Sequence, residues 1–170
     1  LGFAHARDRN KQKEQVVAII GDGAMTGGLS YEGINNLGYH KSQLTIILND
    51  NSHSISKSVG ALSHYLTRVA TNPTYNRIRN DIWEISGKLP MSKNIRKFLR
   101  KTEEGIKGYL TPGTLFEELG LRYIGPIDGH NIEELIHTFR AVKEMNTPVL
   151  VHIYTKKGKR SKLAEDDAIK

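Results

Sequence analysis

The chain of 170 residues contains no cysteine, which excludes a disulfide framework and any metal site built from thiolates. Long apolar runs are also lacking, so no segment approaches the length of a membrane-spanning helix. No secretory leader is recognisable. We therefore expect a soluble, cytoplasmic protein without a membrane partner.

Two common catalytic signatures are missing as well. The sequence has no Gly-x-x-x-x-Gly-Lys-Ser/Thr loop of P-loop ATPases and no Gly-x-Ser-x-Gly turn of hydrolases. The formal net charge of +7 permits anionic ligands, including phosphates. Apart from the stretches 93–101 and 156–160, however, the basic residues are scattered, and no nucleic-acid-binding signature interleaves them with aromatic residues. We therefore expect no nucleic-acid partner.

What the sequence does contain is a pair of apolar, β-branched runs that end in polar residues. Residues 16–20 lead into Gly21-Asp22-Gly23, and residues 44–48 lead into Asn49-Asp50-Asn51. Both runs are typical of buried strands in a parallel sheet, and the interval between them is long enough for one helix. An acid and an amide thus follow two strands at the edge where open α/β sheets bind ligands. Such oxygen donors suit a hard divalent cation, and the glycines would let a diphosphate approach the backbone.

The remaining pattern predicts further helices and strands. We expect helices at residues 1–8, 30–37 and 114–119, and strands at residues 122–125 and 149–154. A last helix begins after Asn131, because Glu134 completes a capping box and apolar residues share one face: Ile132, Leu135, Ile136, Phe139 and Val142. The predicted fold is α/β, a mainly parallel sheet flanked by helices, in a single domain over residues 1–170.

Residues 52–111 interrupt this pattern. Asn72-Pro73 and Leu89-Pro90 break the segment, and two short amphipathic helices are expected near residues 78–85 and 95–106. Insertions of this length between strands are commonly lids, so we expect a mobile loop over the site. Because residues 1–7 look like the end of a helix already under way, we interpret the chain as an internal segment of a larger enzyme, or as the ordered part of one.

Several blocks of the sequence resemble a known family. Gly-Asp-Gly with an asparagine some residues later is similar to the thiamine diphosphate motif, which transketolases and 2-oxoacid dehydrogenases share. The blocks that resemble 1-deoxy-D-xylulose-5-phosphate synthases, within a likeness from residue 1 to about residue 167, are Gly21–Gly28, Leu48–Asn51, Ser54–Ser56, Val59–Leu62, Pro112–Gly120, Tyr123–His130 and Thr155–Gly158. The block Pro112–Gly120 is the most specific of them.

The resemblance assigns metal ligands. It implies Mg²⁺ held by the carboxylate of Asp22, the amide oxygen of Asn51 and the backbone carbonyl of His53, although many members of the family have Met at this last position. The alternative for Asp22 and Asn51 is that both are ordinary turn residues at strand ends. Asn49 and Asp50 fit that turn role better than a ligand role.

The resemblance also assigns contacts to the diphosphate of the cofactor. It places the backbone of Gly21, Gly23 and Ala24 against the diphosphate and makes Lys157 a further contact. A solvated basic turn explains Lys157 equally well. The chain departs from the family at Arg160-Ser161, where a Gly-Tyr pair is usual, so the cofactor contact of that tyrosine is either lost by divergence or separated by a gap in the chain.

Other polar groups have weaker functional readings. We interpret Asp128 and Asn131 as the organisers of the turn into the last helix, and a catalytic role for residues 128–130 is less favoured. Four histidines, His40, His64, His137 and His152, stand alone in the sequence and are expected to be structural or exposed. The segment Ser54–Ser56 is expected near the cofactor or substrate.

By resemblance, the whole enzyme is a homodimeric, magnesium-dependent transferase that condenses pyruvate with D-glyceraldehyde 3-phosphate and releases CO₂. Its product is a precursor of isoprenoids, thiamine and pyridoxal. No catalytic residue is expected within this segment, because the glutamate that activates the cofactor belongs to another domain, so the segment alone should be inactive. The alternatives are a transketolase-like enzyme with another donor and a non-catalytic diphosphate-binding homologue.

Overall fold

The computed structural model describes residues 1–51, 60–61, 64–66, 113–159 and 161. Most of the predicted insertion, including its two expected helices, lies outside these residues. So do His53, Ser54–Ser56 and Arg160.

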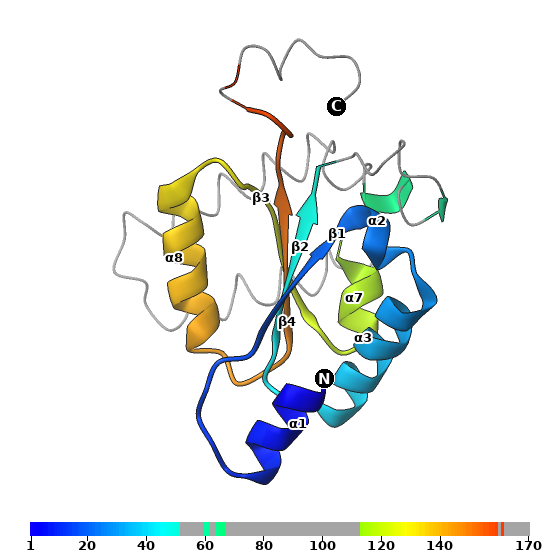
Figure 1. The fold of residues 1–170 in the computed structure, drawn as a ribbon, viewed down its shortest axis with the longest axis vertical. Coiled ribbons are helices and arrows are strands. Elements are labelled where there is room, and N and C mark those ends of the chain that lie inside the picture. The colour runs from blue at the N-terminus through cyan, green and yellow to red at the C-terminus, as the bar shows by residue number, and fades with distance from the viewer. Residues whose placement is uncertain (52–59, 62–63, 67–112, 160, 162–170) are drawn as a thin grey trace, which may run out of the picture.

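The described part is built on a four-stranded parallel sheet (Figure 1). Its strands are β1 (Val17–Gly21), β2 (Thr45–Asp50), β3 (Arg122–Asp128) and β4 (Val149–Tyr154), in the spatial order β1-β2-β4-β3. The two central strands consist largely of β-branched and leucine residues, as expected where both faces of a parallel sheet are covered. The predicted α/β fold is confirmed.

Helices lie on both sides of this sheet. Helix α8 (Ile132–Lys143) covers one face, whereas α3 (Gly28–His40) and α7 (Thr114–Glu118) cover the other, and α1 (Gly2–Arg9) lies beside the sheet end where the strands begin (Figure 1). Two hydrophobic clusters match this arrangement. The larger joins α3 and α7 to β1, β2 and β4, and the smaller joins α8 to β3 and β4.

Helix α8 begins directly after Asn131, as predicted. The side chain of Asn131 accepts a hydrogen bond from the backbone N–H of Glu134 at 3.2 Å, which caps the helix. Its apolar face is narrower than predicted: Leu135, Phe139 and Val142 pack on the sheet, whereas the remaining two apolar residues, Ile132 and Ile136, are exposed.

The boundaries of α3 differ from the prediction. The helix begins at Gly28 rather than Ser30, and it continues through Gly38 to His40. Gly38 does not end the helix but lies against the backbone of Leu119 and Gly120. Lys41 instead takes the left-handed conformation that closes the helix, with φ 54°.

The strands differ in burial. Along β2, inward residues alternate with less buried ones, and Ile46, Leu48 and Asp50 all face the larger cluster or its rim. The prediction that β1 is fully buried was wrong, because Val17 and Ile19 are exposed. Strand β1 lies at the edge of the sheet formed by the described residues, and α8 lies over β3 and β4 rather than over this face.

No helix in the described ranges has both the length and the apolar character needed to cross a membrane.

Candidate functional site

The polar residues predicted to bind a cofactor gather at one edge of the sheet. All four strands run in the same direction, so their carboxyl ends meet at this edge. Gly21 of β1 is level with Asn49 of β2, and Asp50 of β2 is level with Tyr154 of β4. The segments that follow these three strands are the ones that the motifs single out, and this edge is the usual ligand-binding edge of an α/β sheet.

Asp22 is the first residue of a short helix, α2 (Asp22–Met25), which the sequence analysis missed. The helix follows directly on β1 and packs against both β1 and β2. The side chain of Asp22 is buried, with 6% of the residue exposed. Gly21 precedes it in an extended conformation, and a Cβ added there would meet no atom within 4 Å. A buried acid therefore directly follows a residue whose Cβ position is unobstructed at the carboxyl edge.

The backbone after Asp22 is held in a compact turn. The hydroxyl of Thr26 donates to the carbonyl of Gly23 at 2.7 Å, and the hydroxyl of Ser30 donates to the carbonyl of Ala24 at 2.8 Å. The backbone N–H of Gly27 also donates to Ala24, at 3.1 Å. These bonds join α2 to α3 and fix the stretch that the resemblance assigns to diphosphate contacts.

Asn51 directly follows β2 and is half-buried. The preceding residues do not form the turn predicted for them, because Asn49 and Asp50 belong to the strand. Thr155 ties this strand end to the end of β4: its backbone N–H donates to the carbonyl of Asp50 at 2.8 Å, and its hydroxyl donates to the side chain of Asn49 at 3.0 Å. Pairing on both sides of β2 explains why the strand is longer than its apolar run.

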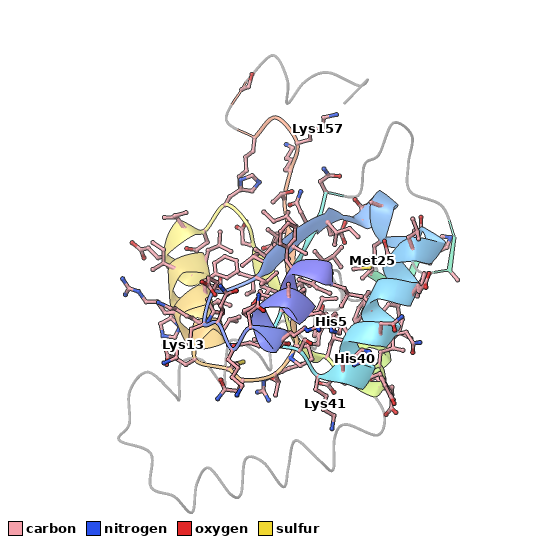
Figure 2. The ribbon with its side chains drawn as sticks, turned by 60° about the horizontal axis from the view of Figure 1, so that its bottom comes forward. His5, Lys13, Met25, His40, Lys41 and Lys157 are labelled. Atoms are coloured by element: carbon pink, nitrogen blue, oxygen red, sulfur yellow. The ribbon has the colours of Figure 1, made fainter. Side chains whose placement is uncertain are left out.

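The loop after β4 presents Lys157 at the same edge. The residue is exposed and lies at one end of the molecule, with Lys41 at the other (Figure 2). The backbone N–H of Lys156 donates to Nε2 of His130 at 2.9 Å, and the backbone N–H of His130 donates to Asp128 at 2.9 Å. Asp128 thus organises the turn after β3, in agreement with its structural interpretation, and His130 holds the loop after β4.

A buried polar cluster beneath this edge was missed by the sequence analysis. His152 of β4, which stands alone in the sequence and was expected to be structural or exposed, contacts Asp50 of β2 and Tyr123 of β3. Its signal in the sequence is the inward position of both His152 and Asp50, each two residues after a buried leucine.

The donor set at the edge is poor in acids. No group of three or more His, Cys, Asp or Glu side chains in the described ranges could hold a metal ion. The predicted set of one carboxylate, one amide and one backbone carbonyl does not require such a group, because Mg²⁺ completes its shell with phosphate oxygens and water. His53, the third predicted ligand, lies outside the described residues.

Comparison with known proteins adds the family. Residues 1–155 match the family model described as 1-deoxy-D-xylulose-5-phosphate synthase. The chain is 48% identical over 170 residues to the 1-deoxy-D-xylulose-5-phosphate synthase of Syntrophus aciditrophicus, covering 99% of this chain and 26% of that protein. It is 47% identical over 168 residues to the enzyme of the same name from Clostridium tetani, covering 98% and 27%. The chain thus spans about a quarter of the length of these relatives.

A solved structure shares the fold. The crystal structure of transketolase from Campylobacter jejuni matches with a TM-score of 0.56 at 21% sequence identity, covering 91% of this chain and 18% of that one. At this identity the likeness shows a common α/β fold.

Proposed function

Because the chain belongs to the 1-deoxy-D-xylulose-5-phosphate synthase family, we propose that it is the domain that binds the diphosphate of thiamine diphosphate in a longer enzyme of that activity. In this proposal residues 1–170 form a single domain. The chain covers 26–27% of the length of these relatives. In the proposal, the rest of the longer enzyme supplies the remaining catalytic groups.

The observation that supports this function best is the meeting of the motif segments at the carboxyl edge. Asp22 is buried, the Cβ position of the preceding Gly21 is open, and Asn51 follows the neighbouring strand. A carboxylate and an amide oxygen from adjacent strand ends fit one hard cation. The open space at Gly21 would allow a diphosphate to reach the backbone closely, which a larger residue would prevent.

The residues present therefore fit a Mg²⁺–diphosphate group. Asp22 and Asn51 would hold the metal with their side chains, and His53 would add its backbone carbonyl. The backbone of Gly21, Gly23 and Ala24 and the ammonium of Lys157 would contact the diphosphate, as the family resemblance implies. Lys157 would act as a mobile point charge, since its side chain is exposed.

The chain's own contribution to catalysis would be positioning. When bound, thiamine diphosphate supplies the electron sink for the decarboxylation of pyruvate. Asp22 and Asn51 would fix one end of the cofactor through the metal, and the hydrogen bonds of Thr26 and Ser30 hold the turn at Gly23 and Ala24 rigid. Rigid attachment keeps the reactive ring in a single orientation, which lowers the entropic part of the barrier.

The whole enzyme, in this proposal, transfers the two-carbon unit of pyruvate to D-glyceraldehyde 3-phosphate and releases CO₂. Its product, 1-deoxy-D-xylulose 5-phosphate, would feed isoprenoid, thiamine and pyridoxal synthesis. We propose a cytoplasmic homodimer. A donor assay would separate this activity from that of a transketolase, since pyruvate should serve as donor and a ketose phosphate should not.

Calorimetric titration of thiamine diphosphate, with and without Mg²⁺, tests the site in the intact enzyme. We expect metal-dependent binding that Asp22→Ala weakens by more than about 100-fold, because the variant lacks a direct metal ligand. Asp128→Asn is the matched control: it removes an acid at the same edge but retains an oxygen that can accept from His130. Unchanged binding by Asp22→Ala, or equal weakening by both variants, would refute the assigned metal site.

A further inference from the structure

Three polar side chains from three neighbouring strands form a continuous buried chain under the candidate site. The hydroxyl of Tyr123 lies 2.7 Å from Nδ1 of His152, and Nε2 of His152 lies 3.2 Å from Oδ2 of Asp50. His152 is fully buried, and Asp50 is 4% exposed. Burying such groups is unfavourable unless each is hydrogen-bonded, so their positions depend on one another.

Both ring nitrogens of His152 take part in hydrogen bonds. A carboxylate only accepts hydrogen bonds, so Nε2 of His152 carries the hydrogen that it donates to Asp50. Nδ1 shares a second hydrogen bond with the hydroxyl of Tyr123, a group that can both donate and accept. The imidazole of His152 therefore joins Asp50 on one side to Tyr123 on the other.

The far end of the chain is held by packing. The ring of Tyr123 stacks on Phe116 of α7, with centroids 5.8 Å apart and planes 5° from parallel. Gly113 lies so close that a Cβ there would be 2.4 Å from the same ring. Helix α7 and the residue before it therefore leave Tyr123 little freedom to move.

The near end of the chain is the residue that precedes Asn51. The side chain of Asp50 is held by His152, and its carbonyl accepts from the backbone of Thr155 at 2.8 Å. Both the strand and the side chain of Asp50 are thus fixed. The backbone from which Asn51 departs has a defined place before any ligand binds.

We propose that Tyr123, His152 and Asp50 are positioning residues that hold Asn51 in the geometry needed to bind the metal. This inference rests on the proposed function, because it takes Asn51 as a ligand. Leu48 and Leu150 occupy the preceding inward positions on the same two strands, and both are fully buried. An apolar pair at the next level would continue that core without the desolvation of a carboxylate, so packing alone does not account for the polar chain.

The test measures metal affinity in the intact enzyme at saturating thiamine diphosphate, by calorimetric titration of Mg²⁺. Tyr123→Phe retains the stacked ring and removes the hydroxyl that is hydrogen-bonded to His152. We expect the Kd for Mg²⁺ to rise about tenfold or more, as for other residues that orient metal ligands. Tyr65→Phe is the matched control. Tyr65 packs against the same Phe116 ring, but it is not one of the three side chains in the hydrogen-bonded chain.

A second variant tests the other end. Asp50→Asn keeps an oxygen that can accept from His152 and should weaken Mg²⁺ binding less than Asp50→Leu, which has no acceptor. If the three residues act as a unit, their effects will not add. The double variant Tyr123→Phe, Asp50→Leu will then bind Mg²⁺ only slightly less tightly than the single variant with the lower Mg²⁺ affinity. Melting temperatures of the metal-free proteins report the merely structural part of each effect.

The outcomes separate the two proposals. An unaltered enzyme that shows no metal-dependent binding would overturn the proposed function and this inference together. Normal metal binding by the unaltered enzyme, with a Kd for Tyr123→Phe within about twofold of it, would overturn the positioning role alone. So would a change shared equally by Tyr65→Phe.

Discussion

Two glycines within helix α3 should respond in opposite ways to substitution by alanine. A Cβ added at Gly38 would lie 1.7 Å from the carbonyl oxygen of Leu119, whereas a Cβ added at Gly33 would meet no atom within 4 Å. Both residues are inside the helix, where alanine is favoured over glycine by about 1 kcal/mol. Helix propensity alone therefore predicts stabilisation by both substitutions, and the packing predicts it only at Gly33.

The magnitude follows from the displacement that Gly38→Ala requires. The backbone near Leu119 would have to move by about 1.7 Å to reach the 3.4 Å of ordinary contact. That backbone has little freedom, because Gly120 adopts φ 86° and also touches Gly38. Overpacking of this kind costs up to about 3 kcal/mol, which exceeds the gain in propensity and leaves a net loss of about 2 kcal/mol.

Urea unfolding of the 170-residue chain, followed by far-ultraviolet circular dichroism, measures both effects. We expect Gly38→Ala to lower the free energy of unfolding by about 2 kcal/mol, or the melting temperature by about 4–8 °C, and Gly33→Ala to raise stability by up to about 1 kcal/mol. A Gly38→Ala protein as stable as the unaltered chain would refute the close approach of α3 to Leu119. Equal losses from both substitutions would refute the assignment of the effect to packing.

Two further predictions concern the end of the sheet where the strands begin. Arg7 is buried and donates to two backbone carbonyls, those of Gln43 at 2.6 Å and Glu14 at 3.2 Å, so Arg7→Met should lower the free energy of unfolding by about 3 kcal/mol in urea titrations. The hydrogen bond from Arg7 also lowers the pKa of Asp8, so this carboxylate contributes stability above its ordinary pKa of 3.8 and loses it as the pH falls through the folded value. Asp8→Asn should therefore reduce the loss of stability between about pH 6 and pH 3, measured as urea midpoints. A variant that loses as much stability over this pH range as the unaltered chain would contradict the prediction.

The sheet was predictable because its signals are local. The β-branched runs and the turn residues after them identify strands, and a helix of suitable length between them indicates a parallel crossover. The strand ends were less accessible, since Asn49 and Asp50 have poor β propensity. They extend β2 because Asn49 pairs with both β1 and β4 and Asp50 pairs with β4, and no local pattern reports that pairing.

The same limit explains α2 and the exposed side of β1. Asp22–Met25 contains a glycine and is too short to show helical periodicity, so its sequence indicates a turn. The apolar run of β1 predicts burial on both faces, yet Ile19 is 75% exposed because α8 covers β3 and β4 instead. Composition identifies a strand that needs covering, but the position of that strand within the sheet determines which faces are covered.

The buried chain beneath the site depends on the spatial order of the strands. Asp50 and His152 are 102 residues apart in the sequence, and they meet only because β4 lies between β2 and β3. Period-two alternation does place both residues inward, each after a buried leucine, and an inward acid or imidazole requires a hydrogen-bonding partner. Sequence reasoning can therefore establish that Asp50 and His152 need partners. The identity of those partners follows from the order β1-β2-β4-β3, which sets Asp50 and Tyr123 on opposite sides of one histidine.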